Sequence, residues 1–148
     1  MAKEVVTDLY RDKPKNNKKL KMSLPLPVSV NALYIGRRHN LSKEAQNYVR
    51  VSRSLINLAI EEQCWLMQGK SVWFYIDLVF FMPDRIVRDS HNMLKLLLDV
   101  LQGLAYQNDY YVLPRIQTVE YDPINPRVDL LIKPQTENER IQGLQIVR

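Results

Sequence analysis

The chain has 148 residues, of which 46% are hydrophobic and 25% charged, with a formal net charge of +5 and a pI of about 9.3. This length suits one domain with a sizeable core and leaves little room for two. No apolar run approaches the roughly 18–20 residues of a membrane span, and the charged start of the chain lacks the apolar region of a secretory signal, so we expect a soluble, cytoplasmic protein without a membrane partner. One cysteine and two histidines exclude an internal disulfide and a metal cage rich in cysteine or histidine.

The first 21 residues are strongly basic. Lysine and arginine neutralise phosphates, so this segment is either a solvated tail or an arm that contacts DNA. We divide the chain into an extension over 1–21, a folded domain over 22–134 and a polar tail over 135–148. Six cationic side chains of the extension fall within eleven positions and are Arg11, Lys13, Lys15, Lys18, Lys19 and Lys21.

A strand and a helix are expected in the first half of the domain. The apolar stretch 24–31 contains two prolines, which predicts an edge strand that runs into an extended loop, because proline cannot donate to a sheet ladder. Ser42 is a good N-cap for the helix that follows. This helix is predicted to reach about Met67 and to be stopped by Gly69. Its apolar stripe recurs at three- and four-residue steps and consists of Tyr48, Val51, Leu55 and Leu58.

A strand and a second helix follow. The segment 72–82 is rich in β-branched and aromatic residues on both alternating faces, with Asp77 as its one charge, which predicts a central strand covered on two sides. Asp89 or Ser90 is expected to cap the next helix, and Gly103 marks its end. Its predicted core-facing stripe consists of Leu94, Leu97, Leu98, Leu101 and Leu104.

The last predicted elements are a strand over 115–121, a turn over 122–126 and an antiparallel partner strand over 128–132. The order is then strand, helix, strand, helix, strand, strand. A terminal hairpin favours an α+β fold over a doubly wound parallel sheet. We therefore predict a small mixed or antiparallel sheet packed by two main helices.

Acidic residues flank the second helix. Asp89 precedes it and Asp109 follows it, while His91 and Lys95 share one of its faces. Carboxylates hold Mg²⁺ together with water and phosphate oxygens, and a nearby lysine would hold the scissile phosphate. Each residue also has a structural explanation: Asp89 caps a helix, His91 is an exposed residue of the first turn, Lys95 pairs with Asp99, and Asp109 forms a turn. Because a helix of about fifteen residues is roughly 22 Å long, the two aspartates meet only if the following loop folds back or a second subunit supplies one of them.

Several short motifs, taken in order, resemble the RusA family of Holliday junction resolvases. The central motifs are Met82-Pro83-Asp84-Arg85, Arg88-Asp89-Ser90-His91-Asn92, Lys95 and Asn108-Asp109. The stretches Leu24–Tyr34, Leu41–Ala45 and Arg127–Ile132 resemble the family's opening segment, helix start and last strand. The resemblance covers about Ser23 to Lys133, and its specificity comes from the order and spacing of the motifs.

The resemblance implies a RusA-like fold and a homodimeric endonuclease of a phage or prophage, active in DNA recombination and repair inside a bacterial host cell. Such an enzyme binds four-way DNA junctions and nicks two opposed strands symmetrically with Mg²⁺ or Mn²⁺. By position, the resemblance makes Asp89, His91 and Asp109 the metal ligands and, with Lys95, the catalytic residues. The residues expected to contact DNA are Arg37, Arg38, Arg85, Arg88 and Asn92.

Two positions depart from the family pattern. His91 stands where the family usually has a second catalytic aspartate, and Asn108 stands where an acid often occurs. An imidazole removes a negative charge and adds a nitrogen ligand that suits Mn²⁺ or Zn²⁺ better than Mg²⁺. The chain is then an active variant with His91 as ligand or base, a weakened enzyme, or a branched-DNA-binding protein that does not cleave. We favour the active enzyme because Asp89, Lys95 and Asp109 remain, and a basic structural protein with no role on DNA is a third reading.

Overall fold

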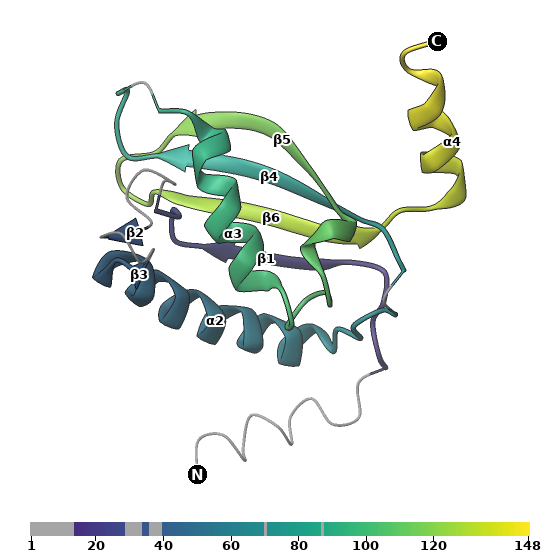
Figure 1. The fold of residues 1–148 in the computed structure, drawn as a ribbon, viewed down its shortest axis with the longest axis horizontal. Helices are drawn as coiled ribbons and strands as arrows, with labels where there is room; N and C mark the ends of the chain where they lie inside the picture. Colours follow the sequence, from purple (N-terminus) through teal and green to yellow (C-terminus); the bar gives the residue numbers. More distant parts are fainter. Residues whose placement is uncertain (1–13, 29–33, 36–39, 70, 87) are drawn as a thin grey trace.

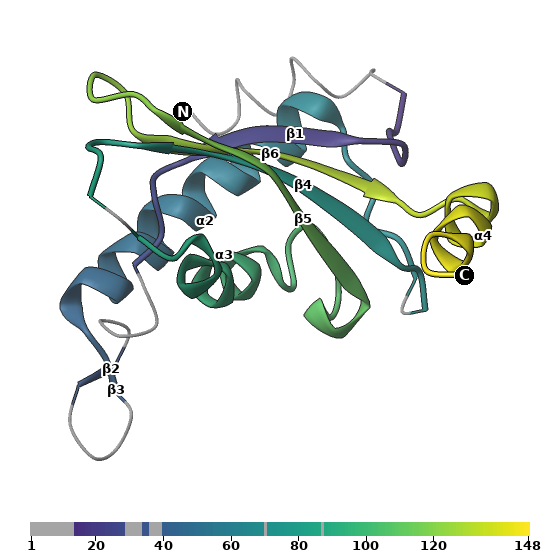
Figure 2. The same ribbon diagram turned by 90° about the horizontal axis from the view of Figure 1, so that it is seen from above.

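The computed structural model describes residues 14–28, 34–35, 40–69, 71–86 and 88–148. A four-stranded sheet is packed by two main helices: α3 crosses one face, and α2 runs beside β1 and against α3 (Figures 1 and 2). The elements in chain order are β1 (Leu20–Leu24), β2 (Tyr34–Ile35), β3 (Asn40–Leu41), α2 (Lys43–Gln63), β4 (Phe74–Met82), the 3-10 turn η2 (Ser90–Met93), α3 (Leu94–Leu101), the 3-10 turn η3 (Asp109–Tyr111), β5 (Val112–Tyr121), β6 (Arg127–Pro134) and α4 (Glu137–Gln145).

The sheet has the order β1-β6-β4-β5, with β4 parallel to β5 and antiparallel to β6. The central position of β4 and the α+β class are as predicted. The predicted hairpin between β5 and β6 is wrong, because β4 lies between them. Their connection crosses the end of β4, where the Asp122 N–H donates to the Met82 carbonyl at 2.8 Å. Two strand spacings amount to only about 10 Å, which a five-residue connection spans easily.

The α2 helix faces the core with a different stripe from the predicted one. Its cap is as expected, since the Ala45 N–H donates to Ser42 Oγ at 3.1 Å. However, Leu55 and Leu58 are exposed. Both stripes have three- and four-residue steps, so periodicity alone does not choose between them. Small residues let the helix approach β1 closely, and the side chains that face the core are Ala45, Tyr48, Ser52, Ile56 and Ala59.

The α2 helix also ends earlier than predicted, well before Gly69. Cys64 adopts a left-handed conformation with φ of 53°, and the Trp65 N–H donates back to the Ile60 carbonyl at 3.0 Å. This turn directs the Trp65 indole into the core, where Nε1 donates to the Ala105 carbonyl at 2.8 Å. The end of α2 at Gln63 thus allows the Trp65 side chain to enter the core and bond to the Ala105 carbonyl.

The second predicted helix is divided into η2 and α3. Asp89 caps η2 as expected, and Gly103 lies in the turn after α3 with φ of 81°. Leu94 and Leu98 are only half-buried, and Leu104 lies beyond the end of the helix. All five residues of the predicted stripe nevertheless belong to the core or pack against it, and the fully buried residues of α3 are Leu96, Leu97, Val100 and Leu101.

Only one face of β4 is fully buried. Residues alternate between buried and half-buried from Phe74 to Met82, so the predicted cover on two sides is complete on one face and partial on the other. On the second face, the Arg115 guanidinium lies 3.6 Å from the centre of the Tyr75 ring and that of Arg127 lies 3.8 Å from the centre of the Phe81 ring. Arginine side chains from the neighbouring strands therefore shield the aromatic residues there.

The two ends of the domain differ in how they are attached. β1 is an edge strand as expected, but it starts at Leu20 and ends before the two prolines. Ahead of it, Asn16 bonds through its backbone to Cys64 and Leu66 at 2.8 and 2.7 Å. At the other end, α4 has no buried residue. None of the helices described is long and apolar enough to cross a membrane.

The core predicts a large loss of stability at Ile76, a fully buried residue of β4. We expect Ile76→Ala to lower the free energy of unfolding by about 2–5 kcal/mol, because it removes buried surface and leaves a cavity. Urea unfolding followed by circular dichroism measures this. Ile124→Ala is the control, since Ile124 is almost fully exposed and its truncation should change stability by no more than about 0.5 kcal/mol. Equal losses in both variants would contradict the assigned core.

Candidate active site

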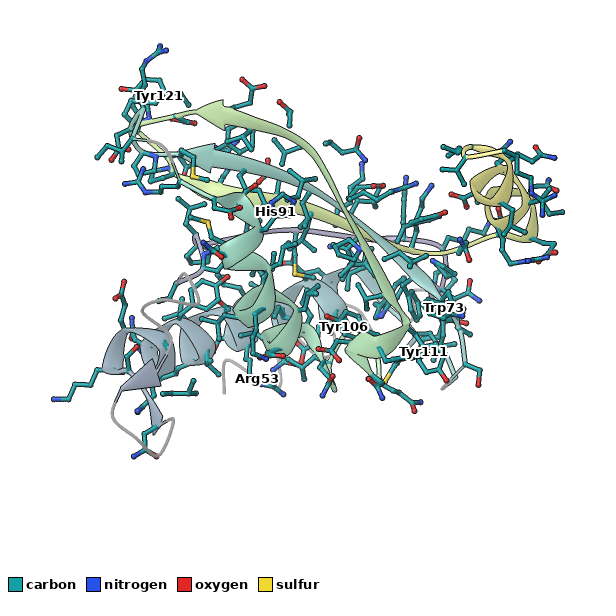
Figure 3. All side chains as sticks on the ribbon, turned by 45° about the horizontal axis from the view of Figure 1, so that its top comes forward. Arg53, Trp73, His91, Tyr106, Tyr111 and Tyr121 are labelled. Atoms are coloured by element: carbon teal, nitrogen blue, oxygen red, sulfur yellow. The ribbon has the colours of Figure 1, made fainter. Side chains whose placement is uncertain are left out.

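Asp89 and His91 form a hydrogen-bonded pair at the start of η2 (His91 is labelled in Figure 3). Asp89 Oδ1 accepts the His91 backbone N–H at 2.9 Å and lies 3.0 Å from the ring Nδ1. The two side chains are 56% and 77% exposed. Hydrogen bonds from the His91 backbone and ring hold the pKa of Asp89 below its ordinary value, so this carboxylate is charged at neutral pH. Because Nδ1 faces the carboxylate, Nε2 is directed away from it.

A second acid, Asp84, is held by an arginine. Arg88 donates to both carboxylate oxygens, from Nη1 to Oδ1 and from Nη2 to Oδ2 at 2.9 Å, and the hydrogen bonds lower the pKa of Asp84. Arg85 lies 4.9 Å over the Tyr121 ring. Arg85 and Arg88, two of the residues expected to contact DNA, precede Asp89 closely in the chain. They line an open hollow of about 600 Å³ with Met82, Asp84, Ile86, Val119, Glu120 and Tyr121.

Lys95 lies one turn beyond His91. Its Nζ donates to Asp99 Oδ2 at 3.4 Å, and both side chains are partly exposed. The ion pair considered from the sequence therefore exists. An exposed pair of this kind contributes at most about 1 kcal/mol, so a phosphate would displace Asp99 from the ammonium at little cost. Asn92, the remaining motif residue, donates its backbone N–H to the Asp89 carbonyl at 3.1 Å.

Asp109 lies at the far end of this helical segment from Asp89. η2 and α3 together span about 20 Å. Asp109 lies near Tyr106, whose pKa is raised by burial and by the charges of Asp109 and Asp99. Across the described ranges, no three His, Cys, Asp or Glu side chains come close enough to hold a metal ion. A single chain thus brings Asp89 and His91 together but does not bring Asp109 to them.

Two residues that position Asp109 have no signal in the sequence. The Asp109 N–H donates to Gln102 Oε1 at 3.0 Å. Arg53 of α2 donates from Nη1 to the Val100 and Gln102 carbonyls at 3.3 and 3.4 Å (Figure 3). The arginine is 49 residues from Gln102 in the chain, so no local pattern connects them. The predicted DNA contacts Arg37 and Arg38 lie outside the residues that the structure describes.

Charged groups of this kind, open to solvent on a basic α+β domain, are those that a protein acting on phosphodiesters needs. The comparison with protein families agrees. Residues 3–133 match the family model described as Endodeoxyribonuclease RusA, so the chain belongs to the RusA family. This is a family of nucleases that act on branched DNA in the resolution of Holliday junctions. No curated protein matches the chain significantly.

Proposed function

We propose that this chain is a metal-dependent endonuclease that resolves four-way DNA junctions by paired, symmetric nicks. It would act as a homodimer in recombination and repair, in the cytoplasm of a bacterium that carries the gene on a phage or prophage. The observation that carries the proposal is the family match over residues 3–133. The exposed Asp89–His91 pair within the matched region supports it chemically.

Asp89 is the residue best suited to hold a divalent cation. Mg²⁺ at phosphoryl-transfer sites is commonly held by one or two carboxylates with waters and substrate phosphate oxygens, and Asp89 is ionised and exposed. A bound cation would polarise the scissile phosphodiester and activate a water for in-line attack. His91 would add Nε2 as a ligand that favours Mn²⁺. The imidazole must turn for one ion to meet both side chains, and its exposure leaves room for that rotation.

Basic side chains around Asp89 would hold the DNA backbone. Lys95 would exchange Asp99 for the scissile phosphate and offset its developing charge. Arg85 and Arg88, beside the open hollow, would contact neighbouring phosphates, and Asn92 would hold the start of η2 in place. Phosphate contacts position a protein without reading sequence, so junction shape would dominate recognition and binding would weaken steeply with added salt.

A homodimer would complete the metal site. A two-fold axis that places α3 antiparallel to its copy would bring Asp109 of one protomer toward Asp89 and His91 of the other. It would also create two equivalent sites, which suits symmetric cleavage of two opposed strands. The separation of Asp89 and Asp109 by the length of η2 and α3 is the reason for proposing a shared site.

The test is cleavage of a synthetic four-way junction labelled in turn on each strand, with Mg²⁺, Mn²⁺ or EDTA in parallel reactions. We expect paired nicks at symmetric positions with either metal, more readily with Mn²⁺, and none with EDTA. A linear duplex of the same sequence should stay intact. Cleavage in EDTA would exclude the proposed metal chemistry.

His91 supports one other candidate, a branched-DNA-binding protein that does not cleave. An imidazole in place of a carboxylate leaves the site short of negative charge for a cation. Tight, salt-sensitive junction binding without nicks in either metal would favour this second function.

A further inference from the structure

Three aromatic side chains form an exposed cluster away from the Asp89–His91 pair: Trp73, Tyr110 and Tyr111. We call them the aromatic cluster. Their ring centres lie 5.0–5.7 Å apart in tilted and edge-to-face arrangements. Trp73 is 38% exposed and Tyr110 is 69% exposed. Figure 3 shows Trp73 and Tyr111 together at the end of the sheet opposite Tyr121.

The cluster is held in place by the parallel pairing of β4 and β5. Phe74 pairs with Val112, so the residues that precede them lie side by side. Three hydrogen bonds fix the backbone around the rings. The Tyr110 N–H donates to Asn108 Oδ1 at 2.9 Å, the Asp109 N–H to Gln102 Oε1 at 3.0 Å, and the Gln135 N–H to the Trp73 carbonyl at 2.8 Å. The exposed rings are therefore pre-positioned.

Exposed lysines lie at the same end of the sheet. β1 and β4 are both antiparallel to β6, and β5 is parallel to β4, so β1, β4 and β5 all begin at one end (Figure 1). Lys15, Lys18 and Lys19 immediately precede β1 and are exposed. β1 and β5 are three strand spacings apart, which is about 14 Å. Cationic side chains and stacking rings at one end of a sheet suit a nucleic-acid strand, whose phosphates and bases need both.

We propose that the aromatic cluster is a stacking platform for an unpaired DNA base at the branch point of a junction, with Trp73 and Tyr110 as the contacting rings. The proposal rests on the proposed function, because it takes branched DNA as the substrate. Asp109 directly precedes Tyr110, so in a dimer that shares its sites the platform would lie beside the cleavage site. A base unstacked there would leave its phosphate open to Asp89 and Lys95.

The composition of the surface favours DNA over a protein partner. The cluster is aromatic, and polar residues form the hydrogen bonds that support it: Asn108, Asp109, Gln102 and Gln135. The buried centre of a protein interface is depleted of charged residues, whereas Asp109 directly precedes Tyr110 and exposed lysines lie at the same end of the sheet. Base stacking needs only the ring faces, and every base can supply its own.

Tryptophan fluorescence offers a direct test, because the chain has two tryptophans and Trp65 is buried. The full-length protein would be titrated with a four-way junction, a single-stranded oligo-dT and a blunt duplex, in EDTA so that no cleavage occurs. We expect the junction and oligo-dT to quench the emission of Trp73 and the duplex to leave it nearly unchanged. The matched control is Trp73→Phe, in which only Trp65 emits and the quenching should disappear.

Binding by Tyr110 variants provides the second measurement. Tyr110→Ala should weaken junction binding by about 5- to 100-fold, the loss expected for one stacked base, with duplex binding changed less than twofold. Tyr110→Phe keeps the ring and should bind like the parent. Equal losses for junction and duplex, or a changed oligomeric state in Tyr110→Ala by light scattering, would overturn the proposal. A junction that quenches Trp73 but is never cut would leave the platform standing and defeat the nuclease proposal alone.

Discussion

Asp89→Asn should abolish junction nicking while leaving junction binding intact. Asparagine lacks the charge that a divalent cation requires, so we expect nicking to fall by at least about 100-fold. Asparagine is also a good N-cap and still accepts the His91 N–H, so η2 and the fold are retained. Loss of a negative charge facing phosphates should leave junction affinity equal or slightly higher. Single-turnover cleavage in Mn²⁺ and gel-shift binding in EDTA measure the two effects.

The control for this change is Asp129→Asn. Asp129 accepts hydrogen bonds from Ser23 and Arg127 in β1 and β6, away from η2, and the substitution makes the same change of charge. Its nicking rate should stay within about twofold of the parent, since changes distant from a site usually have small effects. If Asp89→Asn cut as fast as Asp129→Asn, the assignment of Asp89 to the metal would be wrong.

Local sequence features predicted the parts of the fold that depend on neighbouring residues. Ser42 and Asp89 cap their helices because a cap is a contact across two or three residues. The β-branched and aromatic residues of Phe74–Met82 predicted a central strand, although only one of its two faces is fully buried. The hydrogen bonds between Asp89 and His91 are also local contacts, although these two residues were predicted as metal ligands and their hydrogen bonds were not predicted.

Long-range pairing was not predictable from the same patterns. The order β1-β6-β4-β5 depends on which strands meet, so the hairpin inferred from a turn over 122–126 was wrong. The core face of α2 depends on how closely β1 packs, and two stripes that share Tyr48 fit the periodicity equally well. The aromatic cluster depends on the parallel register between Phe74 and Val112. Helix length, in contrast, indicated that Asp89 and Asp109 meet within one chain only if the following loop folds back, and no metal-binding cluster of the described residues joins them.

The separation of Asp89 and Asp109 makes Asp109→Asn the most informative companion variant. Asp109→Asn and Asp89→Asn should each lose nicking by at least about 100-fold when pure. A site shared between protomers makes a further prediction for the two variants mixed and allowed to exchange subunits. In a mixed dimer, one site has both aspartates replaced and the other has both intact.

Nicking should therefore return on mixing, whereas full resolution should not. Random assortment gives half mixed dimers with one intact site each, so about a quarter of the parent number of active sites is expected. One site per dimer cuts one strand, and the junction should accumulate as a singly nicked product instead of two separated duplexes. Mass spectrometry of tagged subunits would verify the exchange. Exchanged but inactive mixtures would mean that each site is built within one chain, and that the loop carrying Asp109 must move about 20 Å along η2 and α3 when DNA binds.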